Sequence, residues 1–403
     1  MIPLKILDIP YPYKAMLSLT NDIDHCSWNK FQNFHKYFNT NKDTEFGPGL
    51  NIEIGNSFWF FQNPSADEHA FSYFNNLNKQ KSNNYKDIID LNRRGYLDCL
   101  HTWGNFSKVG GFKRIFAEQA VDECITYSLK CPVWINHGDK YNVQNVITGL
   151  GDDPESNYYS SDLLHYLHTK FLWVGDITSY IGQDRKYTVP EIYFNDDSTN
   201  AHKVQTYLKL MCKILLLGHI FSPTANSLLE PVTLRDNQKM TKFVRYGFWN
   251  KATLPDICEI LSEHVIDKLL LNRGKMCVYV HLAKKCTKEV FQNISPIFNR
   301  LAELFHDQNL LICTTSRLLN FASAIKTLKT DIIIRNSKYF IYLTFPSIRE
   351  DQNSNYLLDG LSFAVNSCKN FVFLFNNKEV HFQKKFDPTL KKWILYNPWK
   401  RLS

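Results

Sequence analysis

The fold is decided by a short stretch near the N-terminus, Ser18-Leu19-Thr20-Asn21-Asp22-Ile23-Asp24-His25. The stretch follows an apolar run, so we expect a strand over residues 15–24 whose side chains alternate between two faces. Asp22 and Asp24 would then share one face. Two carboxylates at the carboxyl end of a first strand can hold a metal ion and leave one oxygen free to accept a proton. A solvated turn after a strand has the same residues, so this stretch alone leaves both interpretations open.

Strand-like and helix-like segments alternate along the next three hundred residues. We expect strands at residues 52–61, 96–101, 132–136, 171–174, 277–282 and 310–314. We expect helices at residues 113–129, 163–168, 204–217, 257–271 and 317–325, and another that starts at Ser295-Pro296, since proline suits the first helical position. This alternation predicts an α/β fold with a largely parallel sheet or barrel.

The character of the chain changes near residue 328. Short β-type runs follow, separated by Asn, Asp, Lys and Ser. We therefore expect two domains, a (β/α) barrel over residues 1–328 and a small all-β module over residues 329–403. The module could pack against the barrel, mediate homo-oligomer formation or bind glycan, and its sequence leaves these alternatives open.

Composition and charge narrow the functional class. The 403 residues are 44% hydrophobic and carry a net charge of +8, from 47 basic and 39 acidic residues. This basic excess is mild and forms no dense blocks, so it is only weak support for a nucleic-acid partner, and we expect none. The excess would suit a polyanionic saccharide equally well. Ten cysteines occur without a C-x-x-C pair, a pattern typical of reduced thiols in a cytoplasmic protein.

No segment of the sequence predicts a membrane span or a signal peptide. The most apolar run, residues 208–221, is interrupted by Lys209 and Lys213 and is too short to cross a bilayer. Residues 1–13 contain three prolines and lack the apolar core of a signal peptide. We expect a soluble, cytoplasmic protein.

Polar residues recur where the predicted strands end. Asp22 and Asp24 end the first strand, and His281 ends a late one. Two longer polar runs, His101-Thr102-Trp103-Gly104-Asn105 and Asn136-His137-Gly138, end two others. In a parallel barrel these ends open onto one face, where active sites are built. Each histidine taken singly could instead be a buried, hydrogen-bonded core residue.

The order of these segments resembles the polysaccharide deacetylase family, whose members are metal-dependent hydrolases on a distorted (β/α) barrel. Thr20-Asn21-Asp22-Ile23-Asp24 is similar to the family's Thr-Phe-Asp-Asp, with one residue inserted between the acids. His101-Thr102 is similar to its His-Ser/Thr, and Asn105 stands where the family has a second histidine. Tyr279-Val280-His281 is similar to a late Leu-x-His strand. The resemblance covers about residues 13–327.

The resemblance implies a role for each matching residue. Asp22 would be the general base and His281 the general acid, while Asp24, His101 and Asn105 would hold a divalent metal ion. Zinc is the first expectation, with manganese, cobalt or nickel as alternatives. The implied reaction removes an acetyl group from an N-acetylated sugar or saccharide precursor, so the expected partner is a saccharide.

The sequence departs from the family at two places. Asn105 is a neutral and weaker ligand than histidine. The family's Arg-x-Pro-Tyr element is missing, and residues 130–134 occupy its place without the arginine. Arg245 is a candidate for the lost positive charge, and His137 for a third metal ligand or a substrate contact. Two neighbours of these motifs, Asn136 and Trp103, are further candidates for substrate contacts.

Two other functions fit some of the same residues. Asp22-Ile23-Asp24 matches the Asp-x-Asp motif with which many glycosyltransferases bind a metal and a nucleotide diphosphate. A catalytically inactive saccharide-binding protein would explain Asn105 and the missing arginine. Metal titration combined with an assay of acetate release would separate the three.

Overall fold

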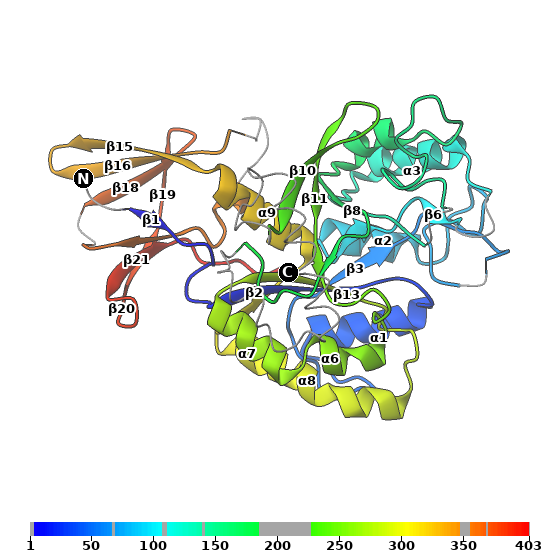
Figure 1. Ribbon diagram of the computed structural model, residues 1–403, viewed down its shortest axis with the longest axis horizontal. Coiled ribbons are helices and arrows are strands. Elements are labelled where there is room, and N and C mark those ends of the chain that lie inside the picture. The colour runs from blue at the N-terminus through cyan, green and yellow to red at the C-terminus, as the bar shows by residue number, and fades with distance from the viewer. Residues whose placement is uncertain are drawn as a thin grey trace, which may run out of the picture.

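The computed structural model describes residues 4–66, 69–106, 111–138, 142–184, 227–346, 355–367 and 370–402. The helix predicted over residues 204–217 lies outside these ranges. Within them, the chain forms a large curled sheet with the shape of a half-barrel, covered by helices, and a smaller all-β module (Figure 1). The predicted mixed α/β class is therefore confirmed at this level.

The half-barrel sheet has eleven strands in the described part of the chain, ten of them in the order β10-β11-β8-β7-β5-β3-β2-β13-β12-β9. The remaining strand, β14, pairs with β2. All neighbouring strands are parallel except β10 and β11. The strands are β2 (Ala15–Asn21), β3 (Gly55–Phe58), β5 (Leu97–Leu100), β7 (Val133–Ile135), β8 (Phe171–Trp173), β9 (Ile177–Thr178), β10 (Leu229–Thr233), β11 (Lys239–Phe243), β12 (Arg245–Tyr246), β13 (Lys275–Val280) and β14 (Leu310–Ile312).

Strand β2 is the centre of this sheet. All seven of its residues are buried, as expected for a parallel strand covered on both faces. One edge pairs with β13 over six consecutive positions, and the other edge is shared by β14 and then β3. The strand ends at Asn21, three residues before the predicted end, so both acids lie in the segment that follows it.

Helices lie on both sides of the sheet. In Figure 1, α1, α6, α7 and α8 gather below β2 and β13, whereas α2, α3 and α9 lie above them. The α-helices are α1 (Trp28–Asn39), α2 (Tyr85–Arg93), α3 (Arg114–Tyr127), α6 (Ile257–Ile260), α7 (Glu263–Asn272), α8 (Lys288–His306) and α9 (Thr315–Thr327). The described ranges also contain the short 3-10 helices η1 (Ser161–Leu167), η2 (Leu254–Asp256) and η3 (Asn355–Leu358).

Two predicted helices differ from the structure. The helix expected over residues 257–271 is two helices, because Ser262 caps α7 by accepting a hydrogen bond from the backbone of Val265. The start predicted at Ser295-Pro296 is wrong: α8 begins at Lys288, and Pro296 lies inside it. The Gln292 carbonyl, which the proline cannot bond, accepts the Ser295 hydroxyl at 3.0 Å instead, so the helix continues.

In its described residues, the C-terminal module consists of two four-stranded sheets. The first contains β15 (Lys329–Arg335), β16 (Lys338–Thr344), β18 (Phe371–Phe375) and β19 (Lys378–Val380). The second contains β1 (Lys5–Ile6), β17 (Ser362–Val365), β21 (Lys392–Tyr396) and β20 (Gln383–Asp387). Buried residues from both sheets, including Ile341, Phe373, Phe363 and Leu395, form one core. The module thus takes a strand from the N-terminus, in the range predicted for the barrel.

Two further expectations from the sequence are reduced thiols and the absence of a membrane span. Eight cysteines are described, all of them free thiols, and six are buried. Across the described ranges, no helix is both long enough and apolar enough to cross a membrane.

Candidate metal centre

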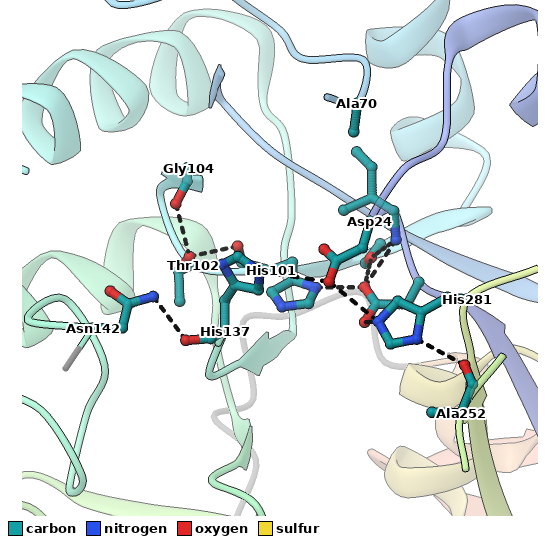
Figure 2. Close-up of polar contacts among 12 residues, drawn as sticks. Asp24, Ala70, His101, Thr102, Gly104, His137, Asn142, Ala252 and His281 are labelled. Carbon is teal, nitrogen blue, oxygen red and sulfur yellow. Dashed lines mark hydrogen bonds and ion pairs between the residues drawn. The ribbon is translucent and has the colours of Figure 1, made fainter. Parts of the chain in front are cut away.

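The acids and histidines singled out in the sequence converge at one end of the half-barrel. Asp22 and Asp24 follow β2, His101 follows β5, His137 lies two residues beyond β7, and His281 follows β13. The strands β7, β5, β3, β2 and β13 are consecutive neighbours in a parallel arrangement, so their carboxyl ends lie side by side. Figure 2 shows the rings of His101 and His137 on one side of Asp24 and the ring of His281 on the other.

These side chains form two overlapping clusters that could hold a metal ion. In the first, ligand-type atoms of Asp24, His101 and His137 all lie within 4.8 Å of one another. In the second, ligand-type atoms of Asp22, Asp24 and His281 also lie within 4.8 Å of one another. Asp24 belongs to both, because its Oδ2 lies 3.5 Å from His137 Nε2 and 3.2 Å from His281 Nε2. The four residues other than His281 are buried, and His281 is only partly exposed.

One oxygen of Asp22 is surrounded by donors. Its Oδ1 accepts hydrogen bonds from the backbone of Ile23 at 2.8 Å and from the hydroxyls of Ser57 at 2.8 Å and Tyr279 at 2.9 Å. The same oxygen contacts His101 Nδ1. Burial alone would raise the pKa of Asp22, but the neighbouring His101 and His281 together hold the pKa well below its usual range. Asp22 is therefore held as a carboxylate.

His281 is held between the two acids. Its Nε2 lies 3.0 Å from Asp22 Oδ2 and 3.2 Å from Asp24 Oδ2, and its Nδ1 donates to the Ala252 carbonyl at 2.7 Å. Burial alone would lower the pKa of His281, but Asp22 and then Asp24 raise it well above its usual value. The imidazole therefore keeps a proton on Nε2 at neutral pH and can donate it.

Asp24 has one oxygen that lacks a partner. Among the described residues no hydrogen-bond donor reaches its buried Oδ1. Burial opposes ionisation of this carboxyl, but His137 and His101 hold the pKa of Asp24 well below its usual range. A buried carboxylate oxygen without a donor is costly, and a bound cation would remove that cost. The residues present therefore fit a metal ion at this position.

The donor set also suits a metal. One carboxylate and two imidazoles is a set that zinc and other first-row divalent ions bind. His101 uses Nδ1 for its contact with Asp22, which leaves Nε2 as its ligand atom. A carboxylate that orients a ligand histidine in this way is common around protein metal sites. His137 supplies the third ligand of the cluster.

Asn105, predicted as a ligand, lies on a separate small sheet. It is buried on β6 (Gly104–Asn105), which pairs with β4 (Phe61–Gln62). Asp24, His101 and His137 already supply three ligands without it. The ligand role of Asn105 stays a prediction.

Asn136 and Trp103 take part in the packing of the neighbouring loop. The Asn136 side chain accepts from Trp134 Nε1 at 2.9 Å and donates to the Val146 carbonyl at 2.8 Å. Trp103 is fully buried, and its Nε1 donates to the Ser160 hydroxyl at 3.1 Å. These contacts connect the ends of β5 and β7 to the segment between β7 and η1.

Arg245 is buried behind the acids. Its Nη1 donates to the Tyr279 carbonyl at 3.1 Å, and its guanidinium lies 4.9 Å from the centre of the Trp173 ring. Burial lowers the pKa of Arg245, and the charge of Asp22 opposes that shift. Its positive charge therefore interacts with the charge of Asp22 through space.

Three residues of the site were not predicted from the sequence. Ser57 and Tyr279 donate to Asp22, and the Trp59 ring packs against His101 and His137 at centroid distances of 5.9 and 5.2 Å. Tyr279 stands two residues before His281, and the period of a strand would have indicated that it shares a face with that histidine. Ser57 and Trp59 lie in and just beyond β3, which carries no motif.

Comparisons with known proteins leave the family open. A scan against models of known protein families finds no match, and a comparison with curated proteins also finds none. The function must therefore be inferred from the residues of the site itself.

Proposed function

We propose that this chain is a metal-dependent hydrolase that removes an acetyl group from an N-acetylated saccharide or saccharide precursor. The observation that carries the proposal is the buried cluster of Asp24, His101 and His137, in which Asp24 Oδ1 lacks a donor among the described residues. A second carboxylate and a protonated imidazole stand beside it. A catalytic zinc site usually has three protein ligands and one coordination position that is open to water or substrate.

The substrate class comes from the sequence motifs. The resemblance of residues 20–24, 101–102 and 279–281 to the polysaccharide deacetylases points to an acetamide on a sugar. Asp24, His101 and His137 would hold the ion, with zinc as the first expectation and manganese, cobalt or nickel as alternatives. Such an ion supplies a Lewis acid and lowers the pKa of a bound water.

The protein's own groups would carry the protons. Asp22 Oδ2 accepts the proton of the attacking water as the water oxygen bonds to the acetyl carbon, while Oδ1 stays anchored by its four contacts. His281 Nε2 then donates its proton to the amide nitrogen as the C–N bond breaks. The products are acetate and a free amine. The hydrogen bond from His281 Nδ1 to the Ala252 carbonyl fixes the ring for this transfer.

One observation favours a second candidate, a saccharide-binding protein that does not hydrolyse. The low pKa of Asp22 makes it a weak base, because the best catalytic base has a pKa near the working pH. Such a protein would keep the same metal ligands and the same fold. It would differ only in releasing no acetate.

The test is an assay of acetate release by the full chain after chelation and reloading with zinc. The probes are an N-acetylglucosamine oligomer and a nucleotide-linked N-acetylglucosamine. Hydrolysis that depends on zinc and is lost in Asp24→Ala supports the proposal. Exposed Asp43 provides the matched control, Asp43→Asn, which should behave as the wild type. Zinc binding without acetate release from either probe supports the binding protein.

A further inference from the structure

Strand β15 forms the outer edge of the C-terminal module. It pairs with β16 from Lys329↔Thr344 to Arg335↔Lys338, so the hairpin loop has only two residues, Asn336 and Ser337. Both have positive φ, 48° and 59°, as in the type I′ turn that joins twisted antiparallel strands. β15 is the first strand in the order β15-β16-β18-β19, and no described strand pairs with its other side. The hairpin lies at the end of the module away from the half-barrel (Figure 1).

The middle of this edge is apolar, although charged residues flank it. Ile332, Ile333 and Ile334 are consecutive and 41%, 39% and 65% exposed. Ile332 pairs with Ile341, which is fully buried in the module core, yet Ile332 itself remains uncovered. Soluble proteins normally protect sheet edges with charges, prolines or bulges, because an exposed apolar edge invites another strand. An exposed apolar edge of this kind can accept a partner strand.

The hairpin decides which backbone groups of β15 are available. In a two-residue hairpin the residues next to the loop form a hydrogen-bonded pair, here Arg335 with Lys338. The backbone groups of Arg335, Ile333 and Asp331 therefore point toward β16. Those of Ile334 and Ile332 point outward, because the direction alternates along an antiparallel strand. A partner strand would bond to these outward groups.

We propose that the chain self-associates through antiparallel pairing of β15 with β15 of a second copy, centred on Ile333. In this two-fold register Ile333 faces its own counterpart, and Ile332 faces Ile334 of the second copy in hydrogen-bonded pairs. Asp331 faces Arg335 of the second copy, twice by symmetry. Cross-strand pairs of opposite charge stabilise a sheet, and non-hydrogen-bonded positions bring the side chains closest.

The charges select this register over its neighbours. Because the outward backbone groups alternate along β15, one strand can slide past the other only in steps of two residues. Each such step moves the centre of the pairing by one residue. A shift that centres the pairing on Ile332 places Lys329 opposite Arg335, which is repulsive. A shift that centres it on Ile334 places Arg335 opposite Ile333 and leaves Asp331 without an opposite charge. Only the register centred on Ile333 pairs all three isoleucines with isoleucines.

The interface is small, which sets the kind of dimer to expect. One strand of seven residues from each copy buries less than the roughly 1,200 Å² that separates weak interfaces from stable ones. We therefore expect a dimer whose population rises with protein concentration. Sedimentation velocity of the full-length chain over a concentration series measures its dissociation constant.

Charge reversal tests the register. Asp331→Arg and Arg335→Asp each replace two attractive pairs by two repulsive ones, so each should weaken the dimer by about tenfold or more. The double variant D331R/R335D restores attraction and should recover wild-type association. Arg335→Asp also lowers the positive net charge of the chain, and a lower net charge on its own would favour association. A weaker dimer in this variant would therefore be caused by the loss of the Asp331–Arg335 pair. Lys329→Glu, which changes charge on the same strand outside the pair, is the matched control.

Cross-linking gives a second readout that does not rely on the charge variants folding. Ile333→Cys places two thiols opposite each other across the two-fold axis and should form a covalent dimer under mild oxidation. Ile334→Cys, which faces Ile332 of the second copy, should cross-link far less, as should the wild type. A wild-type chain that stays monomeric throughout the series overturns the proposal. Failure of the double variant to recover association, or equal cross-linking at positions 333 and 334, overturns this register.

Discussion

The half-barrel buries Asp22, Asp24, His101 and His137 at its strand ends, whereas Ser362 is the one buried polar side chain in the described residues beyond 328. Burying ionisable groups is costly unless they are paired or bind a metal. The module core is instead formed by aromatic and aliphatic side chains, with the rings of Phe363 and Phe382 both stacked on that of Phe373. The half-barrel therefore carries the cost of buried ionisable groups, whereas the core of the module is formed by apolar packing.

Asp24 is the residue whose replacement tests the metal centre of the half-barrel most severely. Asp24→Ala removes the ligand shared by both clusters, so zinc affinity should fall by at least about 100-fold. Calorimetric titration of the chelated protein with zinc measures the loss. Unchanged affinity would mean that the buried acids and histidines of the half-barrel are structural.

A second variant separates the two acids. Asp22→Asn should reduce acetate release by about 10²- to 10⁴-fold, because it removes the proposed base. Zinc should still bind, since Asp22 contacts His101 and is not itself in the cluster of Asp24, His101 and His137. Parallel zinc titrations and acetate assays of this variant decide the matter. If the variant binds zinc more weakly but still hydrolyses the substrate once it is saturated with zinc, the roles of the two acids are exchanged.

The module should respond to the opposite kind of change. Phe363→Ala creates a cavity beside Phe373 and Phe382 and should destabilise the protein by about 3–5 kcal/mol. Zinc affinity of the folded protein should not change, because no group of the metal centre lies in the module. Urea unfolding and zinc titration of the same sample measure both. A marked fall in zinc affinity would contradict the separation of the two regions.

A buried acid outside the metal centre gives a pH test of the half-barrel. Burial raises the pKa of Asp98 to about 6, although its Oδ2 accepts a hydrogen bond from the Ser316 backbone at 2.7 Å. The folded state then binds this proton more tightly than the unfolded chain, whose aspartates titrate near 3.9. The stability from this group is complete below that pH and is lost as pH rises through about 6.

The variant Asp98→Asn isolates this effect, because asparagine keeps an acceptor for Ser316 and does not titrate. Between pH 4 and pH 7 the wild type should lose about 2 kcal/mol of unfolding free energy relative to the variant. Urea unfolding of both proteins across this range measures the difference. A constant difference would mean that the folded Asp98 titrates at its ordinary pH.

The smallest effect is expected at Asn105. If Asp24, His101 and His137 hold the ion, Asn105→Ala should leave zinc affinity within about threefold, whereas His137→Ala should weaken it by about 100-fold. Zinc titration of the two variants side by side measures both. The reverse order of effects would restore Asn105 to the ligand role that the family resemblance predicts.

The sequence predicts the strand ends well because the signal is local. Short apolar runs followed by Asp22, His101, His137 or His281 need only the parallel order of the strands to bring these residues together. Local patterns do not indicate helix α1, because its stretch is rich in asparagine, although Phe31, Phe34 and Phe38 form a buried stripe. A helical period with weak average hydrophobicity depends on tertiary packing to become a helix.

Other features could not be obtained from local patterns. Strand β1 joins the module through a pairing with β17 more than 350 residues later, for which the sequence has no signal. Ser57 reaches Asp22 only because β3 lies beside β2. The break at Ser262 and the continuation of α8 through Pro296 depend on single side-chain hydrogen bonds, which average patterns do not reveal.

The most direct test of the central claim is a crystal structure of the full chain grown with zinc, with anomalous diffraction recorded at the zinc absorption edge. We predict one anomalous peak within bonding distance of an Asp24 oxygen and of imidazole nitrogens of His101 and His137. His281 should lie beside this peak without binding the ion. A peak elsewhere in the protein, or none at these residues at saturating zinc, would contradict the central claim.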